Sequence, residues 1–237
     1  MKILSLDTSS KICSVAVLED TDVIIEKHIE NELTHSQKLM PLVDEILKQT
    51  NLTLKDFDFY ACSVGPGSFT GVRIGVSTVK AFCDVTNVPI VSVSSLESLA
   101  YNTLSSNFTN DADLVCSILD AKNDNVYFGL FKKLNNHFEL VENLDAKNID
   151  EMIALLEKYH STSILFVGDG AEKHQYKLLE YFSKATFVED VHNKQTANSV
   201  GIAGYYHFKN GNFGDSNSIT PLYLRKSQAE RALEGEK

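Results

Sequence analysis

The chain has 237 residues, a formal net charge of −10, 43% hydrophobic residues and 23% charged residues. A chain of this length can bury a sizeable core, either as one large domain or as two small lobes. No apolar run approaches the roughly 20 residues that span a bilayer. Asp7 interrupts the apolar N-terminal stretch, so this stretch does not resemble a signal peptide. The acidic net charge disfavours binding to the phosphate backbone of a nucleic acid. We therefore expect a cytoplasmic protein that does not bind membranes and that binds RNA or DNA poorly by itself.

Apolar periodicity predicts two runs of elements in chain order. In the first run, strands are expected at 2–7, 12–18, 23–29, 58–64 and 89–93, and helices at 34–49, 69–85 and from Ser94 onward. In the second run, strands are expected at 114–119, 125–132, 138–142 and 163–167, and helices at 149–159, 171–182 and 196–208. Both runs contain the order βββαβα, which predicts an α/β protein with two related lobes. A single α+β domain with chance similarity between its halves is the alternative.

Three segments follow from this duplication. An N-terminal lobe is expected over 1–105, a C-terminal lobe over 106–225 and a charged tail over 226–237, with a polar linker near 102–112. The first strand of each run ends in an aspartate, Asp7 or Asp120. These two carboxylates are expected to face a cleft between the lobes, although an aspartate that merely ends a strand and begins a turn would give the same pattern.

Residues 65–75 read GPGSFTGVRIG and place four glycines directly after an expected strand. The stretch is not a phosphate loop of the P-loop type, because the first lysine after Gly65 is Lys80. It is not G-x-G-x-x-G either, because Thr70 stands where the last glycine would be. Gly71 and Gly75 instead lie four apart on one face of the expected helix. Glycine there costs about 0.5–1 kcal/mol relative to alanine, so we expect another backbone to approach that face closely.

The helices expected at 34–49 and 69–85 have wide faces of apolar or small side chains. Such helices could pair with the same two helices of another chain in a four-helix interface. Each helix could equally cover only its own sheet, and the pattern does not choose between the two readings. The four cysteines, Cys13, Cys62, Cys83 and Cys116, form no C-x-x-C pair and are expected to be buried thiols.

Seven segments occur in an order that resembles one family. They are ILSLDTSSKICSVAV, THSQKLMP, SVGPGSFTGVRIG, PIVSVSSLESLA, LDAKNDNVY, GDGA and PLYLR, and they run from residue 3 to about 225. The chain thus resembles the TsaB family of bacterial tRNA threonylcarbamoyladenosine biosynthesis proteins, once labelled glycoprotease-like. The resemblance implies the two-lobed fold shared by actin and sugar kinases, with a truncated second lobe.

The resemblance also implies partners. It implies a heterodimer with the catalytic paralogue TsaD, contact with the ATPase TsaE and with tRNA only through that complex, and self-association as a homodimer. By position, the residues expected at the partner interface are His35, Leu39, Met40, Val43, Gly71, Val72, Gly75, Val76 and Val79.

The sequence argues against a catalytic role. The catalytic paralogue carries an H-x-x-x-H metal-binding pair where this chain has Ser95 and Leu99. Leucine cannot ligate a metal and serine is a poor ligand. No two of the seven histidines lie three to five residues apart, which also argues against a zinc peptidase of the H-E-x-x-H kind. We expect no catalytic residue and no bound metal, with His35 in a capping or interface role.

Nucleotide binding is the remaining question. In the implied fold, the cleft would be formed by Asp7, Thr8, Ser9, Ser10, Asp120, Gly168 and Gly170. The second loop, residues 120–124, contains two acids and no glycine, so its backbone is poorly suited to a phosphate. We expect a vestigial cleft and no cofactor, with weak ATP or ADP at the partner interface at most. The alternatives are a weak ATP-binding protein or ATPase and, on the old label alone, a peptidase.

Overall fold

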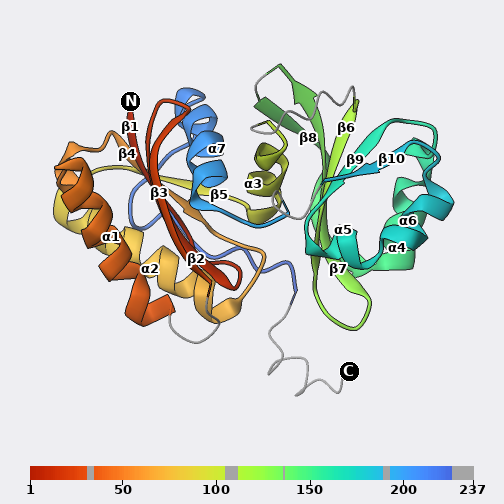
Figure 1. Ribbon diagram of the computed structural model, residues 1–237, viewed down its shortest axis with the longest axis horizontal. Coiled ribbons are helices and arrows are strands. Elements are labelled where there is room, and N and C mark those ends of the chain that lie inside the picture. The colour runs from red at the N-terminus through yellow and green to blue at the C-terminus, as the bar shows by residue number, and fades with distance from the viewer. Residues whose placement is uncertain (31–34, 105–111, 136, 189–192, 226–237) are drawn as a thin grey trace.

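The computed structural model describes residues 1–30, 35–104, 112–135, 137–188 and 193–225 (Figure 1). Thr34, most of the expected linker and the expected tail lie outside the described residues. Two five-stranded sheets form the molecule, and helices cover the outer face of each (Figure 1). The expected two-lobed α/β fold is confirmed.

The first sheet has the order β3-β2-β1-β4-β5. Its strands are β1 (Lys2–Asp7), β2 (Ile12–Glu19), β3 (Asp22–Glu30), β4 (Phe59–Ser63) and β5 (Ile90–Val93). The first three strands are antiparallel, whereas β4 and β5 run parallel to β1. The outer face is covered by α1 (His35–Thr50) and α2 (Phe69–Thr86), with the short helix η1 (Leu54–Asp56) between them in the chain.

The second sheet repeats this order as β8-β7-β6-β9-β10. Its strands are β6 (Leu114–Asp120), β7 (Asn125–Leu134), β8 (His137–Asn148), β9 (Ile164–Val167) and β10 (Ala185–Phe187). The helices beside it are α4 (Ile149–Leu156), η2 (Glu157–Tyr159), α5 (Asp169–Lys173) and α6 (Gln175–Tyr181). The three-residue strand β10 was not predicted, and the expected helix 171–182 is broken at His174, whose φ of −105° and ψ of 16° leave helical geometry.

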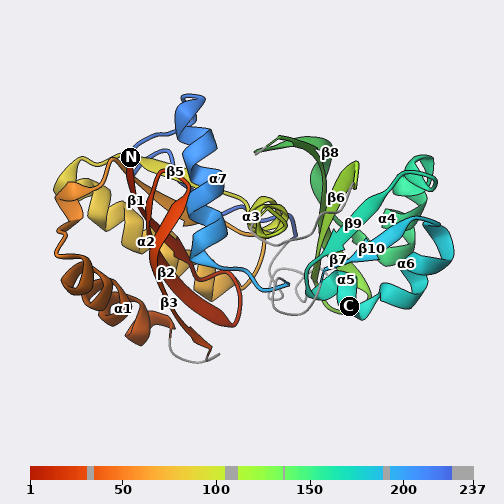
Figure 2. The same cartoon turned by 45° about the horizontal axis from the view of Figure 1, so that its top comes forward.

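The last helix of each half crosses to the other half. Helix α3 (Ser95–Asn102) packs on β6, β7 and β8, whereas α7 (Ala197–Lys209) packs on β1, β2, β4 and β5 (Figures 1 and 2). Gly201 and Gly204 permit this approach, because a Cβ at these positions would lie 2.4 Å from Leu18 and 2.8 Å from Ala61. The expected C-terminal lobe over 106–225 is therefore wrong for α7, which completes the first lobe.

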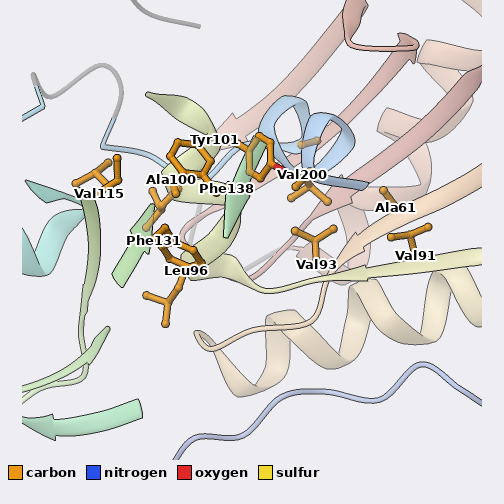
Figure 3. Close-up of a cluster of buried hydrophobic side chains, with 14 of the residues drawn as sticks. Ala61, Val91, Val93, Leu96, Ala100, Tyr101, Val115, Phe131, Phe138 and Val200 are labelled. Carbon is orange, nitrogen blue, oxygen red and sulfur yellow. The ribbon is translucent and has the colours of Figure 1, made fainter. Parts of the chain in front are cut away.

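Helices α3 and α7 pack against each other between the two sheets. Their apolar side chains belong to one buried cluster that continues from the first sheet into the second, from Val91 and Ala61 through Leu96 and Tyr101 to Phe131 (Figure 3). Each lobe has one further cluster, which lies under its outer helices. All four cysteines are buried, as expected.

Candidate functional site

A cleft of about 870 Å³ lies between the lobes. The first lobe contributes Ser9 and Ser10 after β1, Gly67 before α2 and Thr70 within it, and the second lobe contributes the ends of β6 and the start of α5. The expected cleft residues Ser9, Ser10 and Asp120 line it, whereas Asp7, Thr8, Gly168 and Gly170 do not. Asp169 lines it as well, which the sequence did not predict as a site residue.

Asp7 lies beneath the cleft rather than in its wall. Its side chain is 1% exposed, and its Oδ1 accepts hydrogen bonds from the backbone N and the Oγ of Ser9, both at 2.7 Å. Its Oδ2 has no hydrogen-bond partner among the described residues. Burial raises the pKa of Asp7 to about 6, and the two hydrogen bonds from Ser9 limit that rise. Gln195 Nε2 donates to Ser9 Oγ at 3.1 Å and so fixes the same hydroxyl from the α7 side.

Thr8 and Ser10 are held by local contacts. Thr8 Oγ1 donates to the carbonyl of Gly71 at 2.8 Å, which joins the end of β1 to the first turn of α2. His35 Nε2 lies 2.9 Å from the carbonyl oxygen of Ser10 and donates to it, so His35 fixes the start of α1 against the loop after β1. His35 is buried and makes a positioning contact.

Asp120 faces the cleft with its charge already neutralised. Its carboxylate pairs with Lys173 at 2.9 Å and with Lys122 at 3.5 Å. Partial burial would raise the pKa of Asp120, but the hydrogen bonds from Lys173 and from the Lys122 backbone outweigh it and hold that pKa below its usual value. The neighbouring Asp169 accepts from the Asp120 backbone N at 2.9 Å, and burial raises its pKa.

Gly168 and Gly170 contact the chain's own β6 rather than open space. A Cβ on Gly168, whose φ is +107°, would lie 2.2 Å from the carbonyl oxygen of Ile118. A Cβ on Gly170 would lie 2.8 Å from the carbonyl carbon of Leu119. Both glycines are therefore explained by close packing on β6, and neither lines the cleft.

The expected interface residues are mostly interior. His35, Leu39, Val43, Gly71, Val72, Gly75, Val76 and Val79 are buried within the chain itself. Only Met40 is exposed, at 48%. A Cβ on Gly71 would lie 2.0 Å from the carbonyl oxygen of Thr8, and one on Gly75 would lie 2.5 Å from Thr8 Oγ1. The close backbone approach that the glycines indicated is real, but it is made by the loop after β1 and not by another subunit.

The outward face of α2 carries a different set of small residues. Ser77 and Ala81, four residues apart, are exposed along the middle of that face. Ile74, partly buried, and Val85, 70% exposed, flank them. Sequence reasoning missed this face, although the spacing of Ser77 and Ala81 opposite the buried valine stripe was the available signal.

Ser95 and Leu99, which were expected to replace a metal-binding histidine pair, are both fully buried on α3. Ser95 Oγ lies 2.8 Å from Ser63 Oγ, which joins α3 to the end of β4. Among the described residues, no three His, Cys, Asp or Glu side chains lie where they could hold one metal ion. Within the same residues, none of the helices has the length and apolar character needed to cross a bilayer.

Comparisons with known proteins agree with the architecture. The sequence profile of TsaD, tRNA N6-adenosine threonylcarbamoyltransferase, matches residues 29–233. The tRNA threonylcarbamoyladenosine biosynthesis protein TsaB of Bacillus subtilis is 30% identical over 233 residues, which is 97% of this chain and 96% of that protein.

Solved structures extend the likeness of fold. A Pseudomonas aeruginosa protein described as similar to peptidase YeaZ has a TM-score of 0.81 at 24% identity, covering 94% of this chain and 99% of that one. The ROK hexokinase of Thermus thermophilus has a TM-score of 0.55 at 9% identity, covering 89% of this chain and all (100%) of that one. The fold is therefore the two-lobed one shared with sugar kinases, and the chain belongs to the TsaB family.

Proposed function

We propose that this chain is a non-catalytic subunit of the machinery that forms threonylcarbamoyladenosine in tRNA, and that it binds the catalytic paralogue TsaD. The TsaB relatives are biosynthesis proteins of that modification, and the profile of the transferase itself covers most of the chain. In this proposal the protein works in the cytoplasm, and TsaE and tRNA reach it only through the complex.

The observation that carries the proposal is the outward face of α1 and α2. Ser77 and Ala81 occupy the middle of the exposed side of α2, Ile74 and Val85 flank them on the same helix, and α1 exposes Met40. Small side chains allow two helices to approach closely, and the apolar flanks add buried area once a partner covers them. We define these five residues as the partner face.

The same face supports self-pairing. A twofold axis across α1 and α2 would place the partner face of one copy against that of another, as isologous dimers do. The homodimer and the heterodimer then compete for one surface, and formation of the complex requires the homodimer to dissociate.

Two features support a non-catalytic role. Ser95 and Leu99 lie inside the core, where neither reaches the cleft. Asp120 is neutralised by two lysines of its own lobe, so it has little charge left to hold a metal–phosphate group.

A second candidate, a weak ATPase, is favoured by one observation. The Oδ2 of Asp7 is buried next to the cleft and has no hydrogen-bond partner among the described residues. Calorimetry with ATP and Mg²⁺ tests it: we expect binding no tighter than the millimolar range and no turnover. Micromolar binding, together with turnover that is lost in Asp7→Ala, would establish the ATPase instead.

The decisive experiment replaces a residue of the partner face that the fold does not need. Ala81→Arg places a long charged side chain at the centre of the face, and we expect at least a hundredfold weaker binding to TsaD in a titration of the purified proteins. Tyr176→Arg is the matched control, because Tyr176 is 88% exposed on α6 of the other lobe, and it should bind as the unmodified chain does. Wild-type affinity for Ala81→Arg with an unchanged melting temperature would refute the docking face.

A further inference from the structure

Two segments that lie far apart in the chain meet at the start of α2. Phe69 follows the glycine turn, Arg73 begins the RIG motif one turn later, and Tyr223 belongs to the PLYLR segment. The rings of Phe69 and Tyr223 stack with centroids 4.5 Å apart and planes 6° apart. The guanidinium of Arg73 lies 5.9 Å from the Phe69 ring and 5.6 Å from the Tyr223 ring. We call these three residues the arginine junction.

The segment that carries Tyr223 is fixed on both sides. The backbone N of Leu222 donates to the carbonyl of Val64 at 2.7 Å, next to the glycine turn. Arg225 Nη1 donates to the carbonyl of Ala121 in the second lobe at 3.0 Å. Tyr223 is therefore held in place before any partner arrives, and it remains 42% exposed.

The contacts of Arg73 leave one edge of its guanidinium for a ligand. Nε donates to the hydroxyl of Tyr223 at 2.7 Å, so the edge that includes Nε is occupied. In the part of the chain that the structure describes, no Asp or Glu pairs with Arg73. The two Nη groups form the remaining edge, and their fork matches the two oxygens of a carboxylate.

Arg73 borders the partner face. It lies four residues before Ser77 and eight before Ala81 on the same side of α2, and it is exposed. We propose that the arginine junction is a preorganised anchor that binds a carboxylate side chain of the docking subunit; this rests on the proposed function. A cation that is already stacked and oriented loses little side-chain entropy on binding, which is why arginine and tyrosine recur among the residues that dominate interface energies.

The charge of the chain makes a carboxylate contact selective. The protein has a net charge of −10, so most of its surface repels an acidic partner segment. A cation at the rim of the partner face attracts an acidic group to that place and so helps to fix the register of the docked helices.

The test measures affinity for TsaD by titration with the full-length chain. Arg73→Ala should weaken binding at least tenfold. Arg73→Lys should still bind several-fold more weakly than the unmodified chain, because an ammonium group cannot form the two parallel hydrogen bonds of a guanidinium. Tyr223→Phe keeps the stack but removes the acceptor of Nε, and a loss of about threefold is expected. Lys209→Ala is the matched control, since Lys209 also lies over an aromatic ring, Tyr205 at 5.6 Å, but on α7. Raising the salt concentration should weaken the unmodified pair more than the Arg73→Ala pair.

A charge-reversal pair identifies the ligand. Arg73→Glu should abolish binding, and one acidic residue of the paralogue changed to Arg should restore it. If Arg73→Ala binds TsaD with wild-type affinity, the proposal that Arg73 anchors a carboxylate is refuted. If Ala81→Arg nevertheless abolishes binding, the proposed function still holds without that anchor. The anchor is equally overturned if Arg73→Ala pairs normally but its complex loses tRNA, which indicates an RNA phosphate, or if only the homodimer is weakened.

Discussion

Asp7 and Asp120 hold the same place in two sheets with the same strand order: each ends the central strand of its lobe. Their surroundings differ because α7 packs on the first sheet and Gln195, two residues before that helix, donates to Ser9 beside Asp7, whereas the end of β6 lines the cleft. Asp7 is thereby buried, with one oxygen that has no partner in the described part of the chain, and Asp120 is paired with two lysines. The comparison shows that duplication fixed the position of the carboxylate but not its charge state, which packing sets afterwards.

The glycines below these strand ends give the largest expected effect. A Cβ built on Gly71 would lie 2.0 Å from the carbonyl oxygen of Thr8. A Cβ built on Gly170, its counterpart in the second lobe, would lie 2.8 Å from the carbonyl carbon of Leu119. Gly71→Ala should therefore lower the free energy of unfolding by about 3 kcal/mol or more, and Gly170→Ala by about 1–2 kcal/mol. Urea unfolding measures both. Ser77→Ala, on the outward side of α2, is the control and should stay within about 0.5 kcal/mol.

A smaller effect is expected for the two aspartates, whose replacement should change the free energy of unfolding in opposite directions. The folded-state pKa of Asp7 is raised from 3.8 to about 6. The free energy of unfolding is therefore unaffected by this carboxyl below pH 4 and falls as the pH rises through 6, because the buried group must then become charged. Asp7→Asn should therefore stabilise the protein at pH 7.5 by up to about 3 kcal/mol and change little at pH 4. Asp120, whose folded-state pKa is lowered, contributes stability that is lost as the pH falls. Asp120→Asn should cost less than about 1 kcal/mol at pH 7.5.

The measurement is urea unfolding of both variants between pH 4 and pH 8. If Asp7→Asn were destabilising at pH 7.5, the carboxylate would be a structural acceptor that the fold needs, and the contrast between the lobes would be lost.

The smallest effect concerns the contact between the two exchanged helices. His207 on α7 donates from Nε2 to the Glu97 carboxylate on α3, at 2.9 Å. That hydrogen bond raises the pKa of His207, although burial opposes the rise. The stabilisation that the His207–Glu97 pair gives the fold is therefore complete below about pH 6.5 and is lost as the pH rises through the raised pKa. His207→Gln should lose about 1 kcal/mol at pH 6 and less at pH 9.

Glu97→Gln provides the matched test of that pair. It should remove the same pH dependence, and the double variant should lose no more than either single one. Additive losses would mean that the two side chains stabilise their helices separately.

Local patterns were enough to predict most elements of both lobes. Alternation and three-to-four spacing located β1 to β9 and the long helices, because each pattern is set within one element. β10 has three residues and carries too little pattern to be seen. The crossing of α3 and α7 could not be predicted, since an apolar face does not indicate which sheet will cover it.

The candidate site shows the same limit. Paired glycines at 71 and 75 correctly indicated close packing, but the sequence could not tell whether the neighbour was the chain's own β1–β2 loop or another subunit. Asp120 was expected at the cleft because it ends a strand, whereas Ser9 and Ser10 were expected there only from the fold that the family resemblance implies. The arginine junction brings together residues 150 positions apart, a distance at which no local pattern operates.

The exchange of α3 and α7 also affects how the protein is made. On the ribosome, the first sheet keeps one apolar face open until residue 209, the end of its covering helix, has left the exit tunnel. The N-terminal half cannot finish folding while the rest is being translated, so both halves become native together near the end of synthesis.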